Sequence, residues 1–176
     1  MKKYIFKRFG LCLFLFLCCW MKGIAQNGIQ KFFEDYTGDE KFTEVIITPK
    51  MFQMIARLDL NDPDAREIKN ILADLKSLHI LTTANNPNFY YKDALTRFKS
   101  TDYETLMTVR SKEENIRFLT KEDSKGLIKE LLLLVGGKTE FVLISFVGNI
   151  DLNKISQLAN KLDVKGMEHL KDLNKK

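Results

Sequence analysis

Residues 127–147 read LIKELLLLVGGKTEFVLISFV, two nearly continuous apolar runs separated by a short segment that starts with two glycines. Runs of this kind are typical of central strands that are covered on both faces of a sheet. Gly136 and Gly137 accept positive backbone angles without cost, so they predict a hairpin turn between the runs. We therefore expect residues 127–135 and 140–147 to be paired strands at the centre of the fold.

The segment before these runs changes polarity with a period of two, which is typical of strands with one buried face. One side of the alternation holds Tyr103, Thr105, Met107 and Val109, then Ile116, Phe118 and Thr120. The polar residues 111–115 would join the two halves as a hairpin. Together with the central pair, they predict a meander of four strands.

The first part of the chain carries apolar residues at helical spacing. Residues 29–36 predict a short helix and residues 42–48 a strand. A second helix follows Thr48 and Pro49, which suit an N-cap and a first helical position. Its apolar face is formed by Met51, Met54, Ile55 and Leu58.

Three further helices and one strand complete the expected elements. Asp62 and Pro63 open a helix, residues 78–83 predict a strand, residues 85–88 a loop, and Asp151 caps a C-terminal helix. Residues 166–173 are expected to add a further turn or two of helix. The apolar stripes of the three helices are, in order, Ala65, Ile68, Leu72 and Leu75; Tyr91, Leu95 and Phe98; and Leu152, Ile155, Leu158, Ala159 and Leu162.

This order of elements predicts an α+β fold. We expect a mixed, largely antiparallel sheet of about five or six strands packed by helices, ending in the four-strand meander and a C-terminal helix. Residues 26–41 would form a short N-terminal amphipathic helix and residues 42–176 a single domain. The second face of the two central strands needs cover from the C-terminal helix or from a partner, which permits a homodimer through the sheet.

Residues 1–25 have the composition of a secretory signal peptide. They contain five basic residues and no acid, and residues 9–21 form an apolar run shorter than the roughly 20 residues of a membrane-spanning helix. Gly23 and Ala25 suit cleavage after Ala25, so we expect an exported protein of the periplasm or cell envelope. A lipid anchor at Cys18 or Cys19 is the alternative, but Leu17 stands where lipoprotein signals place a small residue. A membrane partner is expected only with such an anchor.

Export changes what the composition means. The chain has 28 basic and 23 acidic residues, and five of the basic ones leave with residues 1–25, so the remainder is balanced in charge. The pI of about 9.0 therefore does not indicate nucleic-acid binding. All three cysteines leave as well, which excludes disulfides, thiol nucleophiles and thiolate metal sites in the processed chain.

The motifs that suggest cofactors fail in their context. Gly136, Gly137, Lys138 and Thr139 resemble the end of a phosphate-binding loop, but the loop's first glycine is replaced by Leu132 and a strand follows instead of a helix. The acids of residues 59–64 lack the glycine and glutamate of a calcium loop. His79 and His169 belong to no zinc pattern. We expect neither a metal nor a cofactor.

Catalytic residues are equally hard to find. A triad of Ser145, His169 and Asp151 is the nearest arrangement to a serine hydrolase, but Ser145 lies inside a strand and not on the sharp turn of such enzymes. Paired acids occur only in expected turns or strand ends, where a solvated surface explains them. The sequence therefore predicts a protein that is not an enzyme.

Phe89, Tyr90 and Tyr91 are the most suggestive cluster for binding. Aromatic side chains beside an asparagine-rich loop can stack on a ligand or anchor a partner protein. Packing is the competing explanation and the favoured one, since Tyr91 belongs to a helical stripe and Phe89 precedes it closely.

Several segments resemble an exported family known as domain of unknown function 4252, found in Bacteroidetes-type bacteria. The resemblance spans about residues 40–173, and its most distinctive step runs from Gly148 to Leu152. The other matching segments are residues 47–52, 75–82, 131–135 and 142–147. The resemblance implies an exported cell-envelope protein with no assigned activity and no catalytic residues to transfer.

Three functions remain open from the sequence. The first is a non-catalytic module that binds another envelope protein or a small ligand. The second is a periplasmic carrier or sensor for a small apolar or aromatic ligand held between helices and sheet, which predicts an enclosed apolar cavity of roughly 300 Å³ or more. The third is an unrecognised hydrolase that uses carboxylates or a serine.

Overall fold

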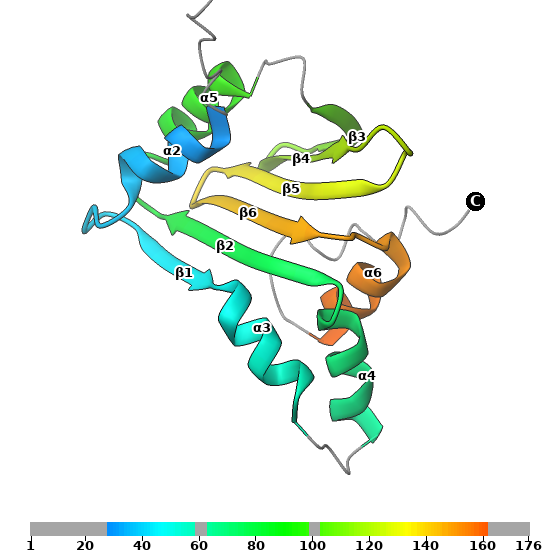
Figure 1. Ribbon diagram of the computed structural model, residues 1–176. Coiled ribbons are helices and arrows are strands. Elements are labelled where there is room, and N and C mark those ends of the chain that lie inside the picture. The colour runs from blue at the N-terminus through cyan, green and yellow to red at the C-terminus, as the bar shows by residue number, and fades with distance from the viewer. Residues whose placement is uncertain (1–27, 59–62, 99–102, 162–176) are drawn as a thin grey trace, which may run out of the picture.

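The computed structural model describes residues 28–58, 63–98 and 103–161, and Figure 1 shows a six-stranded sheet with helices packed against it. The spatial order of the strands is β1-β2-β6-β5-β4-β3, and every neighbouring pair is antiparallel. The α+β class and the final meander are confirmed, with a sheet that is antiparallel throughout. The strands are β1 (Thr43–Ile47), β2 (Leu75–Thr83), β3 (Glu104–Arg110), β4 (Glu114–Glu122), β5 (Ile128–Gly137) and β6 (Phe141–Gly148).

The helices divide between the two faces of the sheet. One face packs against α2 (Gly28–Tyr36) and α5 (Pro87–Arg97), and we call it the α2/α5 face. The opposite face packs against α3 (Pro49–Ala56), α4 (Pro63–Leu72) and α6 (Leu152–Lys161), and we call it the α3/α4/α6 face. In Figure 1, α2 and α5 lie together at the opposite end of the sheet from α3 and α4.

The central strands supply apolar side chains to both faces, as their continuous apolar runs predict. On β5, Leu131 and Leu133 join the core of the α3/α4/α6 face, whereas Leu132 and Leu134 join that of the α2/α5 face. These four side chains are at most 1% exposed. The chain's own helices therefore cover both faces, so a partner is not needed to explain the apolarity of these strands.

The hairpin between β5 and β6 lies where the sequence places it, but its glycines have a different role. Gly137 N donates to Glu140 O at 2.9 Å, so Lys138 and Thr139 form the two-residue loop. Neither Gly136 nor Gly137 has a positive φ angle. A Cβ atom at Gly136 would lie 2.3 Å from Cγ of Tyr91. The glycine at position 136 therefore allows α5 to approach β5 closely.

The edge strand β3 contains a bulge that the alternation of polar and apolar residues in its sequence does not reveal. The pairing with β4 shifts register between Thr105 and Met107, which makes Leu106 an extra residue. As a result, Met107 packs on the α3/α4/α6 face beside Phe118, whereas Tyr103 packs on the α2/α5 face. The prediction that Tyr103 and Met107 share one side of the sheet was wrong.

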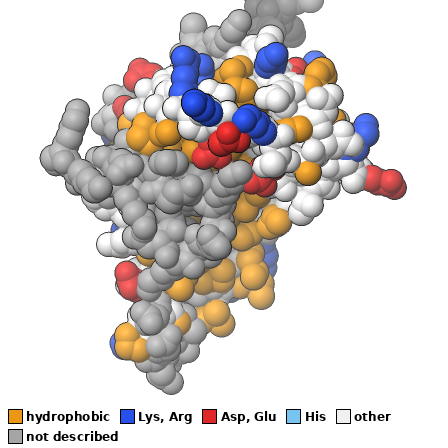
Figure 2. All heavy atoms as spheres, turned by 180° about the vertical axis from the view of Figure 1, so that it is seen from behind, with side chains coloured by type: hydrophobic (Ala, Val, Ile, Leu, Met, Phe, Trp, Pro, Cys, Tyr) orange, Lys and Arg blue, Asp and Glu red, His pale blue; other side chains and the backbone are white. Residues whose placement is uncertain are grey.

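The helix α3 buries less of its apolar stripe than expected. Phe52 is its buried side chain, whereas Met51, Met54 and Leu58 are each at least half exposed. Figure 2 shows apolar side chains gathered in the lower half of the molecule, where Figure 1 places α3 and α4. Thr48 is the N-cap residue and Pro49 the first residue of the helix, as predicted, although the Thr48 side chain makes no capping hydrogen bond.

Other boundaries differ by a few residues. Leu75 begins β2 and does not continue the helix before it. The expected loop at 85–88 is shorter, because α5 starts at Pro87 after Asn86, whose left-handed φ of 49° turns the chain. Asp151 caps α6 as predicted, since its Oδ1 accepts from the backbone N of Asn153 at 2.8 Å.

Several predictions lie outside the described residues. They are the signal peptide at 1–25 with Cys18 and Cys19, the cap at Asp62, Leu162 of the last apolar stripe, and the helical turns at 166–173. The division into residues 26–41 and 42–176 stays a prediction, although α2 contributes Phe32 and Phe33 to the core of the α2/α5 face. Among the residues that the structure describes, there is no helix with the length and apolarity needed to span a membrane.

Candidate functional site

A cleft of about 440 Å³ lies between α2 and the sheet on the α2/α5 face. Its floor comes from the middle strands β2, β5 and β6, and its wall comes from one side of α2 and the residue that follows it. A cleft of this size suits a small molecule. Its lining residues are Ile29, Gln30, Phe33, Glu34, Thr37, Ser77, His79, Glu130, Ser145 and Val147.

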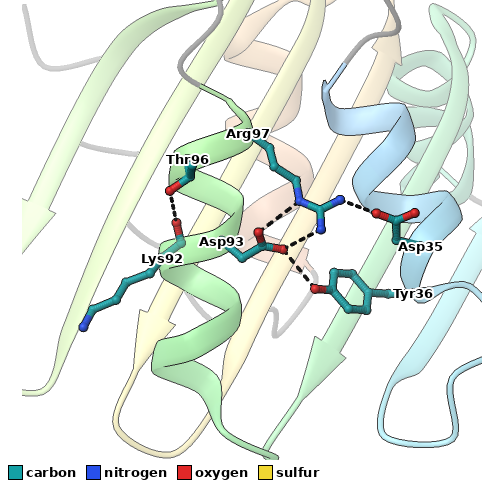
Figure 3. Close-up of polar contacts among 6 residues, drawn as sticks. All are labelled: Asp35, Tyr36, Lys92, Asp93, Thr96 and Arg97. Atoms are coloured by element: carbon teal, nitrogen blue, oxygen red, sulfur yellow. Dashed lines mark hydrogen bonds and ion pairs between the residues drawn. The ribbon is translucent and has the colours of Figure 1, made fainter.

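The wall of the cleft is fixed by a polar junction between α2 and α5 (Figure 3). Arg97 of α5 forms ion pairs with Asp35 of α2 and with Asp93 one turn before it. The hydroxyl of Tyr36 donates to Asp93 Oδ2 at 2.9 Å. Burial and this hydrogen bond raise the pKa of Tyr36 to about 12, so the phenol stays protonated at neutral pH.

Aromatic packing beneath this junction also holds α2 in place. The ring of Phe32 packs edge-on against Tyr36 and Phe98, with ring centroids 4.8 and 5.7 Å apart. The guanidinium of Arg97 lies 5.4 Å from the centre of the Phe32 ring. Since Phe32 is fully buried, the helix that forms the cleft wall is anchored on its inner side.

His79 lies in the floor of the cleft, on β2. Its ring stacks on Phe33 with centroids 3.7 Å apart and planes inclined by 14°. Nε2 of His79 lies 2.7 Å from Oε1 of Glu44, a residue of the neighbouring strand β1. Because an ionised carboxylate can only accept, Nε2 is the protonated nitrogen when Glu44 is ionised.

Glu44 is held ionised by its neighbours. The hydroxyl of Thr37 donates to its Oε1 at 2.7 Å and is the main reason why the pKa of Glu44 lies below its usual value. Burial opposes this effect, and His79 adds to it. Thr37 and His79 both contact Oε1 of Glu44.

Glu130 is the second carboxylate of the floor, and it lies on the central strand β5. It accepts hydrogen bonds from Ser145 Oγ at 2.9 Å and from the hydroxyl of Tyr103 at 2.6 Å. Within the described residues, Glu130 has no ion pair within 4.0 Å. Its cross-strand partner Lys121 places its ammonium 5.6 Å from the centre of the Tyr103 ring instead.

Ser145 and His79 are direct cross-strand partners on β6 and β2. Such pairs have Cβ atoms about 5 Å apart, so these side chains are neighbours in the floor. However, the serine hydroxyl donates to Glu130, and Nε2 of His79 faces Glu44. The arrangement presents hydrogen-bonding groups to the cleft, but not a serine whose proton is held by a histidine.

The other residues of the candidate triad do not join this site. His169 lies outside the described residues. The carboxylate of Asp151 accepts hydrogen bonds from the first turn of α6. The structure thus combines Ser145 with His79 and Glu130, a set that the sequence did not single out.

The aromatic cluster predicted for binding lies elsewhere on α5. Tyr90 and Tyr91 are buried in the core of the α2/α5 face, with 7% and 9% of their surface exposed. Phe89 is 56% exposed and packs edge-on against Tyr90 at 5.2 Å. None of the three lines the cleft. Contact between this cluster and a ligand or partner stays a prediction, and Phe89 is its accessible member.

A smaller hollow of about 210 Å³ lies at the start of α6. Its charged groups are already paired, since Lys154 binds Asp74 there. No group of three or more metal-ligating side chains is found in residues 28–58, 63–98 and 103–161. The cleft beside α2 is consequently the better candidate for a functional site.

A sequence signal for the cleft exists, although it is weak. His79, Glu130 and Ser145 are polar residues that interrupt apolar strand segments, and period-two counting puts Glu130 on the same face as Leu132 and Leu134. A carboxylate at a core-facing position is unusual unless it is paired or hydrogen-bonded. What could not be read from sequence is that three strands place these groups together under α2.

Comparison with known proteins identifies a family and nothing more specific. No curated protein and no solved structure matches the chain. A family model described as a domain of unknown function, DUF4252, matches residues 36–158. That range contains the polar floor of the cleft, whereas the α2 side chains of the wall precede it. The chain therefore belongs to the DUF4252 family.

Proposed function

We propose that this protein is an exported, non-catalytic binding module of the cell envelope, and that it holds a small ligand in the cleft beside α2. The observation that carries the proposal is the composition of the cleft. Its floor presents polar groups from His79, Glu130 and Ser145, and its wall and rim add apolar surface from Ile29 and Phe33. Largely preformed clefts with a few convergent polar groups are the usual form of small-molecule sites.

The binding proposal is tested by locating bound fragments on the protein. A small-molecule fragment library would be screened by amide and methyl NMR with the chain lacking residues 1–25. We expect shift changes that centre on His79, Ser145 and Val147. Hits that perturb only the region of Phe89 would move the site to the aromatic cluster, and a library without hits would count against a small ligand.

Hydrolysis is the alternative that the neighbouring Ser145 and His79 raise. We favour binding because the serine proton is donated to Glu130 and Nε2 of His79 faces Glu44, so no histidine is positioned to take that proton. Hydrolysis of nitrophenyl esters by the wild type, but not by Ser145→Ala, would overturn the non-catalytic proposal. Equal background rates for the two proteins would support it.

Export is proposed from residues 1–25, whose basic start and apolar run precede Gly23 and Ala25. N-terminal sequencing and intact mass of the protein from fractionated cells test it. We expect a periplasmic or envelope product that begins at Gln26. A lipid-bearing N-terminus at Cys18 or Cys19 would place the module on a membrane, and an uncleaved cytoplasmic chain would contradict export.

A further inference from the structure

The cleft is rich in hydrogen-bond acceptors and poor in cations. Its lining includes the carboxylates of Glu34 and Glu130, and no lysine or arginine. The one lining side chain that can become a cation is His79, and its Nε2 is already committed to Glu44. Lys121, the cross-strand partner of Glu130, places its ammonium 5.6 Å from the centre of the Tyr103 ring and does not line the cleft. An anionic ligand would therefore meet like charge, whereas a cation would be attracted.

Glu130 is the group best placed to receive such a cation. It is half-buried on a central strand, and its described partners are two neutral hydroxyls, those of Ser145 and Tyr103. A carboxylate offers about four acceptor directions, so two remain after these bonds. A partly buried carboxylate gains more from a charged donor than from neutral donors alone.

Ser145 adds acceptor capacity at the same place. It is 5% exposed and directs its proton to Glu130. Since the hydroxyl hydrogen is used in this bond, the oxygen can act toward the cleft only as an acceptor. Glu130 and Ser145 together suit a group with several donors and a positive charge, which describes a primary ammonium.

The apolar residues that line the cleft indicate which part of a ligand would accompany the ammonium group. Ile29 and Phe33 of α2 and Val147 of β6 supply apolar surface beside the polar floor. Phe33 is held rigid because its ring stacks on His79. A ligand with an apolar or aromatic part next to its charge would use both halves of the cleft.

We propose that the cleft binds an amphipathic primary amine, with its ammonium on Glu130 and Ser145 and its apolar part against Ile29, Phe33 and Val147. This inference rests on the proposed function, because it names the ligand class of the same cleft. It differs from the sequence-based expectation of a purely apolar or aromatic ligand by adding a required positive charge.

Three probes of similar size and different charge test the inference: 2-phenylethylamine, 2-phenylethanol and phenylacetate. Affinities would be measured by NMR titration of the chain lacking residues 1–25, at pH 7 and low salt. We expect the amine to bind roughly tenfold more tightly than the alcohol, since one charge-assisted hydrogen bond accounts for such a ratio. Phenylacetate should be the weakest of the three.

Glu130→Gln keeps the side-chain shape and removes the charge, so it should abolish the preference for the amine over the alcohol. Glu113→Gln is the matched control, because Glu113 is exposed, does not line the cleft, and pairs with Lys138, which follows the far end of β5 from Glu130. It should leave all three affinities unchanged. If Glu130→Gln fails to fold, the comparison of probes on the wild type decides alone.

The outcomes separate the two proposals. Equal binding of all three probes at His79 and Val147, or tightest binding of phenylacetate, would overturn the ammonium inference and leave the binding cleft standing. An amine preference that survives Glu130→Gln would also overturn it. Failure of every probe and every library fragment to perturb the cleft would count against the proposed function itself.

Discussion

Gly136→Ala is expected to destabilise the protein, because the added methyl group would collide with α5. Its Cβ would lie 2.3 Å from Cγ, 2.4 Å from Cδ2 and 2.8 Å from Cβ of Tyr91. Rotation about the Cα–Cβ bond of Tyr91 can move Cγ and Cδ2, but not the Cβ atom that is fixed to the helix. Tyr91 is also buried. The clash therefore requires a shift of the α5 backbone away from β5.

The cost follows from two opposing effects. Overpacking of a well-filled core costs about 1–3 kcal/mol. Replacing a glycine inside a strand recovers roughly 0.5–1 kcal/mol of backbone entropy. We expect a net loss of about 1–2 kcal/mol, which for a chain of this size lowers the melting temperature by about 2–8 °C.

Urea denaturation followed by far-UV circular dichroism measures this loss. Thr139→Ala, in the exposed loop of the same hairpin, should change stability by less than about 0.5 kcal/mol and serves as the control. A double-mutant cycle with Tyr91→Ala adds a second test, since removing the ring should relieve part of the clash. A Gly136→Ala protein as stable as the wild type, or additive effects in the cycle, would refute the close approach of α5 to β5.

Three further predictions concern the polar contacts and the cores. The pKa of Tyr36 is raised to about 12 from 10.0, so the contribution of its phenol to stability is complete below pH 10 and declines as the pH approaches 12. Tyr36→Phe should remove this part of the loss of stability at alkaline pH, measured by urea denaturation at several pH values. A loss of stability with pH as steep as that of the wild type would contradict the role of Tyr36. The pKa of Glu44 lies below 4.5, so the contribution of its carboxylate to stability is present above that pH and is lost as the pH falls through the pKa of the folded state. Glu44→Gln should weaken the protein at neutral pH and flatten this acid dependence of stability. An acid dependence identical to that of the wild type would argue against the contact with His79. On α3, Phe52→Ala should lower the free energy of unfolding by about 3–5 kcal/mol and Met54→Ala by less than about 1 kcal/mol, because Phe52 is 5% and Met54 is 55% exposed. Thermal melts measure both losses. Similar losses for the two variants would mean that the face of α3 that carries Met54 is covered.

The strands and the final meander were largely predictable from the sequence because polarity reports burial, whereas the places of β1 and β2 beside β6 were not predicted. The apolar runs at 127–135 and 140–147 predicted two central strands covered on both faces, and the hairpin between them was placed correctly. The role of Gly136 was not predictable, because its reason is the ring of Tyr91, 45 positions earlier in the sequence. Local patterns record the conformation of a residue but not which distant side chain lies against it.

The bulge at Leu106 shows a second limit. A strand that gains one residue still alternates on either side of the insertion, so counting from Tyr103 to Val109 gave one continuous face. The structure divides that face between the two cores. On α3 the limit is different: an apolar stripe of Met51, Met54 and Leu58 predicts a buried face, but periodicity cannot say whether another element covers it.

The candidate site depended on tertiary structure most of all. Its floor combines side chains from three strands that are adjacent in space but not in sequence, and its wall is α2, which the α5 junction holds in place. The sequence offered Ser145 with His169, whereas the sheet pairs Ser145 with His79. Register, which no local pattern specifies, decides which polar groups meet.

A comparison of the two faces of β5 and β6 argues that this polar floor is more than an imperfect core. On the α3/α4/α6 face, the same stretch of these strands carries Leu131 and Phe146, which are almost fully buried. On the α2/α5 face, the next residues along, Glu130 and Ser145, are polar and lie directly under the cleft. Glu130 is half-buried there, and its described partners are two neutral hydroxyls, so its carboxylate would gain from a charged donor. The ammonium group proposed above would supply that donor at the position where the two faces of these strands differ.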